Sequence, residues 1–235
     1  MYQINLVGIV AQVDVKNAAY KLVTTIESKD KVIEIPSIVH QPTWYDWMPG
    51  VGDLMLIKGC SAFIYEKEKF KIVTKEDMII VGMHIQAEYA LIMANSFQGQ
   101  ALGNISMFGS GNIGKADGLR FLPDGTAVTN FSVATTRRGV PEKTGEGETL
   151  REETPLWTRL SIWGALAESV DPYLNKGTFV VFEATPKFDE FGSLRHYETD
   201  AKEVRSSFEA TVNKIHISSG NGGRREATTE TELVF

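Results

Sequence analysis

Short runs of β-branched and apolar residues recur along both halves of the chain, and most of them alternate with polar positions. In the first half these runs are Ile4–Val15, Tyr20–Glu27, Val32–Val39, Leu54–Lys58 and a hairpin from Ser61 to Val81. In the second half they are Asn104–Gly109, Ala127–Arg137, Trp157–Trp163, Thr178–Glu183, a hairpin over Lys187–Tyr197, and Phe208–Ile217. Alternation with a period of two indicates strands with one buried face. The chain is therefore predicted to be all-β.

Helical periodicity is convincing only over Ala165–Leu174, between two strands of the second half. A turn at Pro123-Asp124-Gly125 separates the first two strands of that half. An order of strand, turn, strand, loop, strand, helix, strand and hairpin is typical of an oligonucleotide-binding (OB) barrel. Asn5-Leu6-Val7-Gly8 recurs loosely as Ser106-Met107-Phe108-Gly109, so the two halves are interpreted as duplicated, diverged barrels.

Two tandem OB-folds, with one short helix in the second, divide the chain into four parts. A diverged OB-fold is expected over residues 1–82 and a second OB-fold over 104–217, followed by a short flexible tail over 218–235. The connecting segment 83–103 is apolar and carries one charge, Glu88, so it is too apolar for a free linker. It fits either an interdomain helix or an added strand.

Length and composition fit a soluble globular protein. The chain has 235 residues, of which 43% are hydrophobic and 23% charged. No apolar run reaches the roughly 18 to 20 residues that cross a bilayer, and no basic leader precedes the apolar start, so we expect a cytoplasmic protein without membrane contact. Cys60 is the only cysteine and there are four scattered histidines, which leaves no metal site or disulfide to propose.

Charge is distributed unevenly between the halves. The net charge of −6 argues weakly against a nucleic-acid ligand, but the first arginine in the chain is Arg120. Arginine suits planar, bidentate contacts to phosphate and stacking on flat groups. Its confinement to the second half predicts that the two halves do different work.

Gly109–Lys115 satisfies the dinucleotide pattern G-x-G-x-x-G and nearly satisfies the P-loop pattern. Both mechanisms require a helix to start at the glycines, so that its amides face the phosphates. Gly118 and Pro123 follow too soon for a helix, and Ala116 stands where a P-loop needs a hydroxyl. We therefore interpret the segment as flexible glycines at a strand end and hairpin, and we expect no enzyme activity and no cofactor. An enzyme that uses this loop ranks third among the possible functions, after the two described below.

Several segments of the second half, in the right order, resemble the bacterial single-stranded DNA-binding protein family. They are Asn112–Lys115, Arg120–Thr135, Trp157–Glu168 and Tyr173–Gly177, within a match that covers roughly residues 104–197. The resemblance implies an OB barrel that wraps single-stranded DNA without reading its sequence, in replication, recombination and repair. It also implies a homodimer, because family members with one barrel form tetramers and those with two form dimers.

Sequence-independent binding needs flat side chains for base stacking and cations along the backbone. Trp157 and Trp163 are six residues apart in one expected strand and so share a face; with Phe188 they are the candidate stacking residues. Arg159 shares that face and could pair with phosphate or with Glu183. The other candidate phosphate contacts are Arg120, Arg137, Arg138, Lys187 and Arg195, of which Arg137-Arg138 stand where the family often has another tryptophan.

The first half contributes an aromatic cluster beside a Pro-Gly turn. Trp44 and Trp47 are possible secondary stacking residues, but such a cluster more often plugs a barrel end or forms a subunit contact. At the other end of the chain, Leu233, Val234 and Phe235 close an acidic tip that could bind replication or repair proteins, or be an inert terminus. The rival function is an OB-fold assembly protein of a primosome-like complex, with secondary nucleic-acid contacts.

Overall fold

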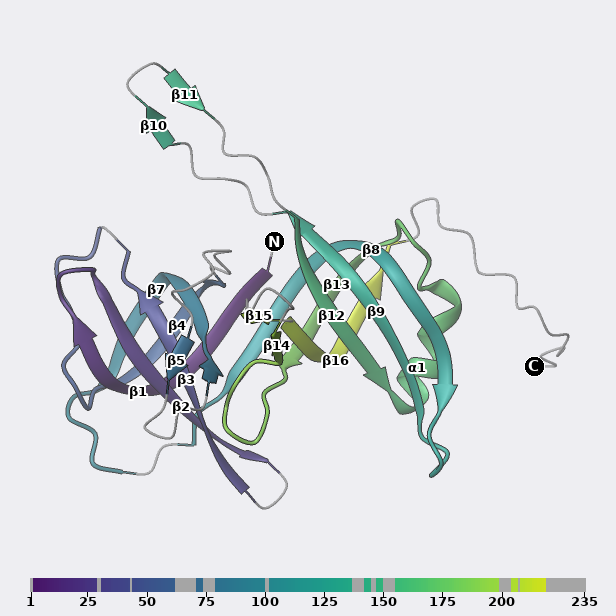
Figure 1. The fold of residues 1–235 in the computed structure, drawn as a ribbon, viewed down its shortest axis with the longest axis horizontal. Coiled ribbons are helices and arrows are strands. Elements are labelled where there is room, and N and C mark those ends of the chain that lie inside the picture. Colours follow the sequence, from purple (N-terminus) through teal and green to yellow (C-terminus); the bar gives the residue numbers. More distant parts are fainter. Residues whose placement is uncertain are drawn as a thin grey trace, which may run out of the picture. The chain divides into compact units, whose positions relative to one another are not determined.

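The computed structural model consists mostly of strands (Figure 1). The part of the chain that it describes comprises residues 2–28, 31–42, 44–61, 71–73, 79–99, 102–136, 142–144, 147–149, 155–198, 204–206 and 208–218. The all-β prediction is confirmed. The helical residues in this part are α1 (Gly164–Val170) and the single 3-10 turn η1 (Asp171–Tyr173), which together begin and end one residue before the helix expected over Ala165–Leu174.

The first closed circuit of strands is built from the N-terminal residues. Its strands are β1 (Tyr2–Asp14), β2 (Ala19–Ser28), β3 (Lys31–His40), β4 (Leu54–Ser61) and β7 (Met83–Ala94). They pair in the order β1-β2-β3-β7-β4, and β4 pairs again with β1. The β3–β7 pair is parallel, and the other pairs are antiparallel. A sheet that closes on itself in this way is a barrel with no free edge strands.

The segment 83–103 contributes the fifth strand of this circuit. Of its two alternatives, helix or added strand, the strand is correct for Met83–Ala94. Met83, Ile85 and Ala87 alternate into the core, each almost completely buried. The segment is therefore apolar because it supplies a strand to the barrel wall, which a free linker would not do.

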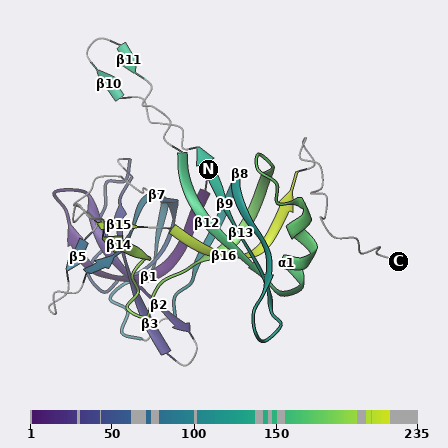
Figure 2. The same ribbon diagram turned by 45° about the vertical axis from the view of Figure 1, so that its right-hand side comes forward.

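A second closed circuit follows the first in the sequence. Its strands are β8 (Ile105–Phe121), β9 (Ala127–Thr136), β12 (Pro155–Trp163), β13 (Phe179–Pro186) and β16 (Phe208–Ile217). They pair in the order β8-β9-β12-β16-β13, and β13 pairs again with β8. Helix α1 connects the third strand of this circuit to the fourth, as the OB pattern predicted. In Figures 1 and 2, β12, β9 and β8 lie side by side.

Short strands form three further two-stranded pairs. They are β5 (Lys71–Val73) with β6 (Ile79–Val81), β10 (Glu142–Thr144) with β11 (Gly147–Thr149), and β14 (His196–Glu198) with β15 (Val204–Ser206). The β5–β6 pair lies in the hairpin expected over Ser61–Val81, most of which is outside the described residues.

The chain divides into two compact units. One contains residues 1–109 with 183–210, and the other 110–182 with 211–235. Their boundaries fall inside β8, β13 and β16, because each of these strands runs from one unit into the other. The division of the chain into 1–82, 83–103, 104–217 and 218–235, made from the sequence, stays a prediction.

The glycine-rich stretch Gly109–Lys115 lies in the middle of a strand. The structure confirms that no helix starts there, but the interpretation as a strand end is wrong, because β8 continues to Phe121. Gly111 is needed where β8 packs against β9: a Cβ at this position would lie 2.2 Å from the carbonyl oxygen of Ala134. The turn that ends the β8–β9 hairpin is at Pro123-Asp124-Gly125, as expected, and Gly125 adopts a φ of +80°.

Two histidines meet in the first compact unit, on the parallel strands β3 and β7. Nε2 of His40 and Nδ1 of His84 are 3.3 Å apart, and their ring centroids are 5.5 Å apart. Burial lowers the pKa of His40; burial, together with the charge of His40, lowers the pKa of His84 to about 4. The folded protein therefore favours the uncharged pair.

This pair predicts a loss of stability on mild acidification. Because an unfolded histidine has a pKa of about 6.5, the unfolded chain binds more protons than the native one between pH 6.5 and about 4, and stability falls as the pH falls through that range. Thermal midpoints from pH 7.5 to 5 should decrease less for His84→Gln than for the wild type. The exposed His216 is the matched control, and His216→Gln should retain the wild-type dependence. Equal slopes for all three proteins would contradict the prediction.

Candidate nucleic-acid interface

Strand β12 presents both candidate tryptophans on one face. The indoles of Trp157 and Trp163 are 50% and 41% exposed, and Arg159 between them is exposed as well. The alternate residues Thr158 and Leu160 are completely buried. The alternation predicted from the sequence is therefore confirmed, and neither tryptophan is a core residue.

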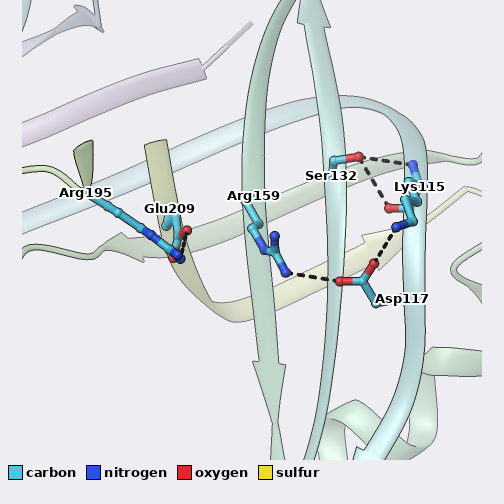
Figure 3. Close-up of polar contacts among 6 residues, drawn as sticks. All are labelled: Lys115, Asp117, Ser132, Arg159, Arg195 and Glu209. Carbon is cyan, nitrogen blue, oxygen red and sulfur yellow. Dashed lines mark hydrogen bonds and ion pairs between the residues drawn. The ribbon is translucent and has the colours of Figure 1, made fainter. Parts of the chain in front are cut away.

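A row of polar residues crosses this face between the two tryptophans. Arg159 on β12 is opposite Ser132 on β9, and Ser132 is opposite Lys115 on β8. The Ser132 hydroxyl accepts a hydrogen bond from the Lys115 amide at 3.1 Å and donates one to the Lys115 carbonyl oxygen at 3.4 Å (Figure 3). These contacts tie β8 to β9 where two cationic side chains face the solvent.

Arg120 lies in the parallel row through Trp163. Trp163 is opposite Val128 on β9, and Val128 is opposite Arg120 on β8. Arg120 is exposed, and Phe121 next to it is 61% exposed where β8 ends. Phe121 is a further candidate for stacking that the sequence analysis did not single out.

The position of the Trp157 indole depends on a glycine that lies two strands away. A Cβ on Gly114 of β8 would lie 2.3 Å from Cζ3 and 2.6 Å from Cη2 of the Trp157 indole. The indole therefore extends from β12 across β9, where Trp157 is opposite Ala134, and reaches the bare backbone of β8. A glycine in the apparent nucleotide motif thus makes room for an exposed aromatic ring.

Together these residues form what we call the β12–β9–β8 face: Lys115, Arg120, Ser132, Trp157, Arg159 and Trp163. All of them belong to the second compact unit. The structure therefore brings together four of the residues selected from the sequence: Arg120, Trp157, Arg159 and Trp163. The sequence analysis missed Lys115 as a member because it interpreted Gly109–Lys115 as a strand end.

Asp117 on β8 adds an acidic side chain beside these residues. Its Oδ2 lies 3.2 Å from Nη2 of Arg159, and its Oδ1 lies 3.3 Å from Nζ of Lys115 (Figure 3). The ion pair of Arg159 is therefore made with Asp117, an acid the sequence analysis did not consider. Register shifts on both sides of Lys115 and Ala116 interrupt the period of two in β8, so spacing along the strand alone does not predict this contact.

Three other candidates lie on the segment after β13, in the first compact unit. Phe188 and Lys187 are half-buried, and the Lys187 amide donates a hydrogen bond to the carbonyl oxygen of Glu209. Arg195 is exposed and pairs with Glu209, its Nη1 lying 2.9 Å from Oε1 (Figure 3). The expected hairpin over Lys187–Tyr197 is in fact a tight turn at Asp189–Ser193, followed by β14.

The aromatic cluster of the first unit also contains Tyr45. Trp44 is 70% exposed, and its ring centroid is 6.5 Å from that of Tyr45, which is 5.3 Å from the half-buried Trp47. The Gln41 side chain donates a hydrogen bond to the Trp47 carbonyl oxygen, which fixes the loop between β3 and β4. Trp44 thus projects from the cluster and Trp47 helps to anchor it.

The remaining candidates lie outside the described residues: Arg137, Arg138, Leu233, Val234 and Phe235. In the part of the chain that the structure does describe, no group of three or more His, Cys, Asp or Glu side chains could hold a metal ion. No helix in that part is long and apolar enough to cross a bilayer.

The part of the chain that carries this face is similar to known proteins. Residues 105–218 match the family model described as the single-strand binding protein family. This part of the chain is thus similar to that family, in agreement with the resemblance found in its sequence. The match includes β8, β9 and β12 and extends past the segments that carried the resemblance, to the end of β16.

Curated relatives match the same half of the chain. The single-stranded DNA-binding protein of Paenarthrobacter aurescens is 37% identical over 108 residues, which are 45% of this chain and 56% of that protein. That of Corynebacterium glutamicum is 33% identical over 115 residues, which are 49% of this chain and 47% of that protein. The chain thus spans about half the length of the curated relatives it matches.

Solved structures extend the similarity of fold to nearly the whole chain. The wild-type single-stranded DNA binding protein from Thermus aquaticus covers 98% of this chain with a TM-score of 0.55 and 16% identity. A deletion mutant of the same protein covers 92% with a TM-score of 0.52 and 16% identity. At this identity the likeness concerns the fold alone, and it confirms the prediction of OB-folds.

Proposed function

We propose that the protein binds single-stranded DNA without reading its sequence and protects it during replication, recombination and repair. One observation carries the proposal: two half-exposed tryptophans on the β12–β9–β8 face flank a row that contains Lys115 and Arg159. Any base can stack on an indole, and cations can follow any phosphate backbone. The family match over residues 105–218 and the names of the curated relatives support the same function.

Titration with a mixed-sequence single strand tests this function directly. We expect tryptophan fluorescence to be quenched on binding, because stacked bases lie against the indoles, and we expect the matching duplex to bind much more weakly at the same salt concentration. Affinity should fall with salt with a slope of about −0.7 per phosphate contacted, as counterions are released. Equal affinity for duplex and single strand would contradict the proposal.

The other selected residues extend the proposed interface. Trp44 and Trp47 are proposed as secondary stacking residues, Phe188 as a third stacking residue, and Arg137, Arg138, Lys187 and Arg195 as phosphate contacts. The exposure of Trp44 and Arg195 supports their inclusion. We also propose that Leu233, Val234 and Phe235 bind replication or repair proteins, that the protein acts in the cytoplasm, and that it catalyses no reaction and uses no cofactor.

A homodimer is the proposed functional particle. Each chain carries two closed circuits of strands, so two copies bring four barrels to the DNA. Closed two-fold symmetry is also the commonest arrangement among soluble oligomers. Light scattering at micromolar concentration should give about twice the chain mass of 26.0 kDa. A mass of one chain would count against the dimer.

A further inference from the structure

We propose that Asp117 occupies a phosphate site on the β12–β9–β8 face, and that its carboxylate must be displaced when DNA binds. Asp117 then limits the affinity for single strands and favours their release. The inference rests on the proposed function, because it names the place of one phosphate and the residue that competes for it.

The two cations already converge on one anion. The Asp117 carboxylate accepts from Nζ of Lys115 at 3.3 Å and from Nη2 of Arg159 at 3.2 Å, one oxygen to each (Figure 3). Lys115 is on β8 and Arg159 is two strands away on β12, yet both side chains reach the same carboxylate (Figure 3). A phosphate also offers two oxygens to separate donors, so the carboxylate shows where one phosphate would bind.

The local backbone of β8 holds Asp117 at this place. The register of β8 against β9 shifts between Ala116 and Leu119, which is a β-bulge. Gly118 within the bulge has a φ of +84°, a conformation that glycine adopts without strain. Bulges commonly re-aim a neighbouring side chain, and here the carboxylate returns to the face that carries Lys115.

The ion pairs are weak enough to open. The side chains of Lys115, Arg159 and Asp117 are 80%, 52% and 38% exposed, and exposed ion pairs contribute little to stability. Losing them costs the fold little, but the released carboxylate stays close to the incoming phosphate and repels it. The loss of the ion pairs and the repulsion of the phosphate both weaken DNA binding, and neither depends on which base is bound.

Asp117→Asn keeps the shape of the side chain and removes its charge. At about 0.1 M salt we expect single strands to bind about fivefold more tightly, the effect of one unit charge at about 4 Å in water. The matched control is Glu168→Gln, which removes an exposed acid from α1. It should change the affinity less than twofold. Asp117→Ser is a second variant, and thermal midpoints check that all the proteins are folded.

A second background separates competition from simple repulsion. In Lys115→Gln/Arg159→Gln protein the carboxylate has lost its partners, so adding Asp117→Asn should increase the affinity no more than Glu168→Gln does. A fivefold increase in that background would show repulsion without a shared site and would overturn the inference. If the wild type binds single strands but neither Asp117→Asn nor Asp117→Ser binds them more tightly, the inference is also overturned. If the wild type does not bind single strands, the proposed function itself is wrong.

Discussion

Replacing Trp157 or Trp163 with alanine is expected to weaken single-strand binding by about 1–3 kcal/mol each, which is about 5- to 150-fold. The thermal midpoint should hardly change, because both indoles are about half exposed and each contributes little to the core. Quenching of the remaining tryptophans would report binding in a fluorescence titration, and anisotropy of a labelled strand would measure the affinity independently.

Two matched variants make this test sharper. Phe131→Ala, in the core behind the same face, should lower stability by about 3–5 kcal/mol, because Phe131 is 2% exposed. Gly114→Ala should weaken binding although it removes neither tryptophan, because the added Cβ would displace the Trp157 indole. A large fall in stability for Trp157→Ala would mean that the indole is a structural residue.

The β12–β9–β8 face was partly predictable because strand alternation is a local property. The spacing of Trp157, Arg159 and Trp163 within one strand was enough to place them on one side, and their exposure agrees. The order of strands around α1 was also sufficient to predict the second barrel. Both inferences use only residues close together in the sequence.

What the sequence did not predict depends on contacts between distant strands. The role of Gly114 requires the Trp157 side chain to cross β9, and no spacing within β8 reveals that. The bulges after Ile113 and Ala116 break the period of two in the same stretch, so Lys115 and Asp117 could not be assigned to a face by counting. Two glycines of a spurious nucleotide motif are in fact positions where other parts of the sheet approach the backbone.

The second large effect, a loss of stability, is expected for a substitution in the segment after β13. It is anchored within the first compact unit: the Ser193 hydroxyl accepts a hydrogen bond from the Val81 amide, and the Leu194 amide donates one to the Val81 carbonyl oxygen, both at 2.9 Å. Ser193 and Leu194 are completely buried. Nearby, the exposed Glu190 pairs with Lys31 at 2.9 Å. The turn between Phe188 and Arg195 is therefore held by a buried side-chain hydroxyl, a backbone hydrogen bond and an exposed ion pair.

Gly192 lies in this turn where it approaches β3 closely. Its φ is +76°, and a Cβ there would lie 2.0 Å from the carbonyl oxygen of Glu34 on β3, a backbone atom that cannot rotate away. We expect Gly192→Ala to lower the free energy of unfolding by about 2–4 kcal/mol, of which about 1–2 kcal/mol is the cost of the left-handed conformation and the rest the displaced backbone. Urea denaturation would measure the loss.

Gly125 separates these two contributions. Its φ of +80° is nearly the same, but nothing lies within 4 Å of a Cβ built there, so Gly125→Ala carries only the conformational cost. The difference between the two variants then measures the contact of the turn with β3. Because the face that carries Trp157 and Trp163 is in the other compact unit, Gly192→Ala should leave that face intact and alter only the contacts proposed for Phe188 and Arg195. Equal losses of stability for Gly192→Ala and Gly125→Ala would mean that the contact with β3 does not hold the turn.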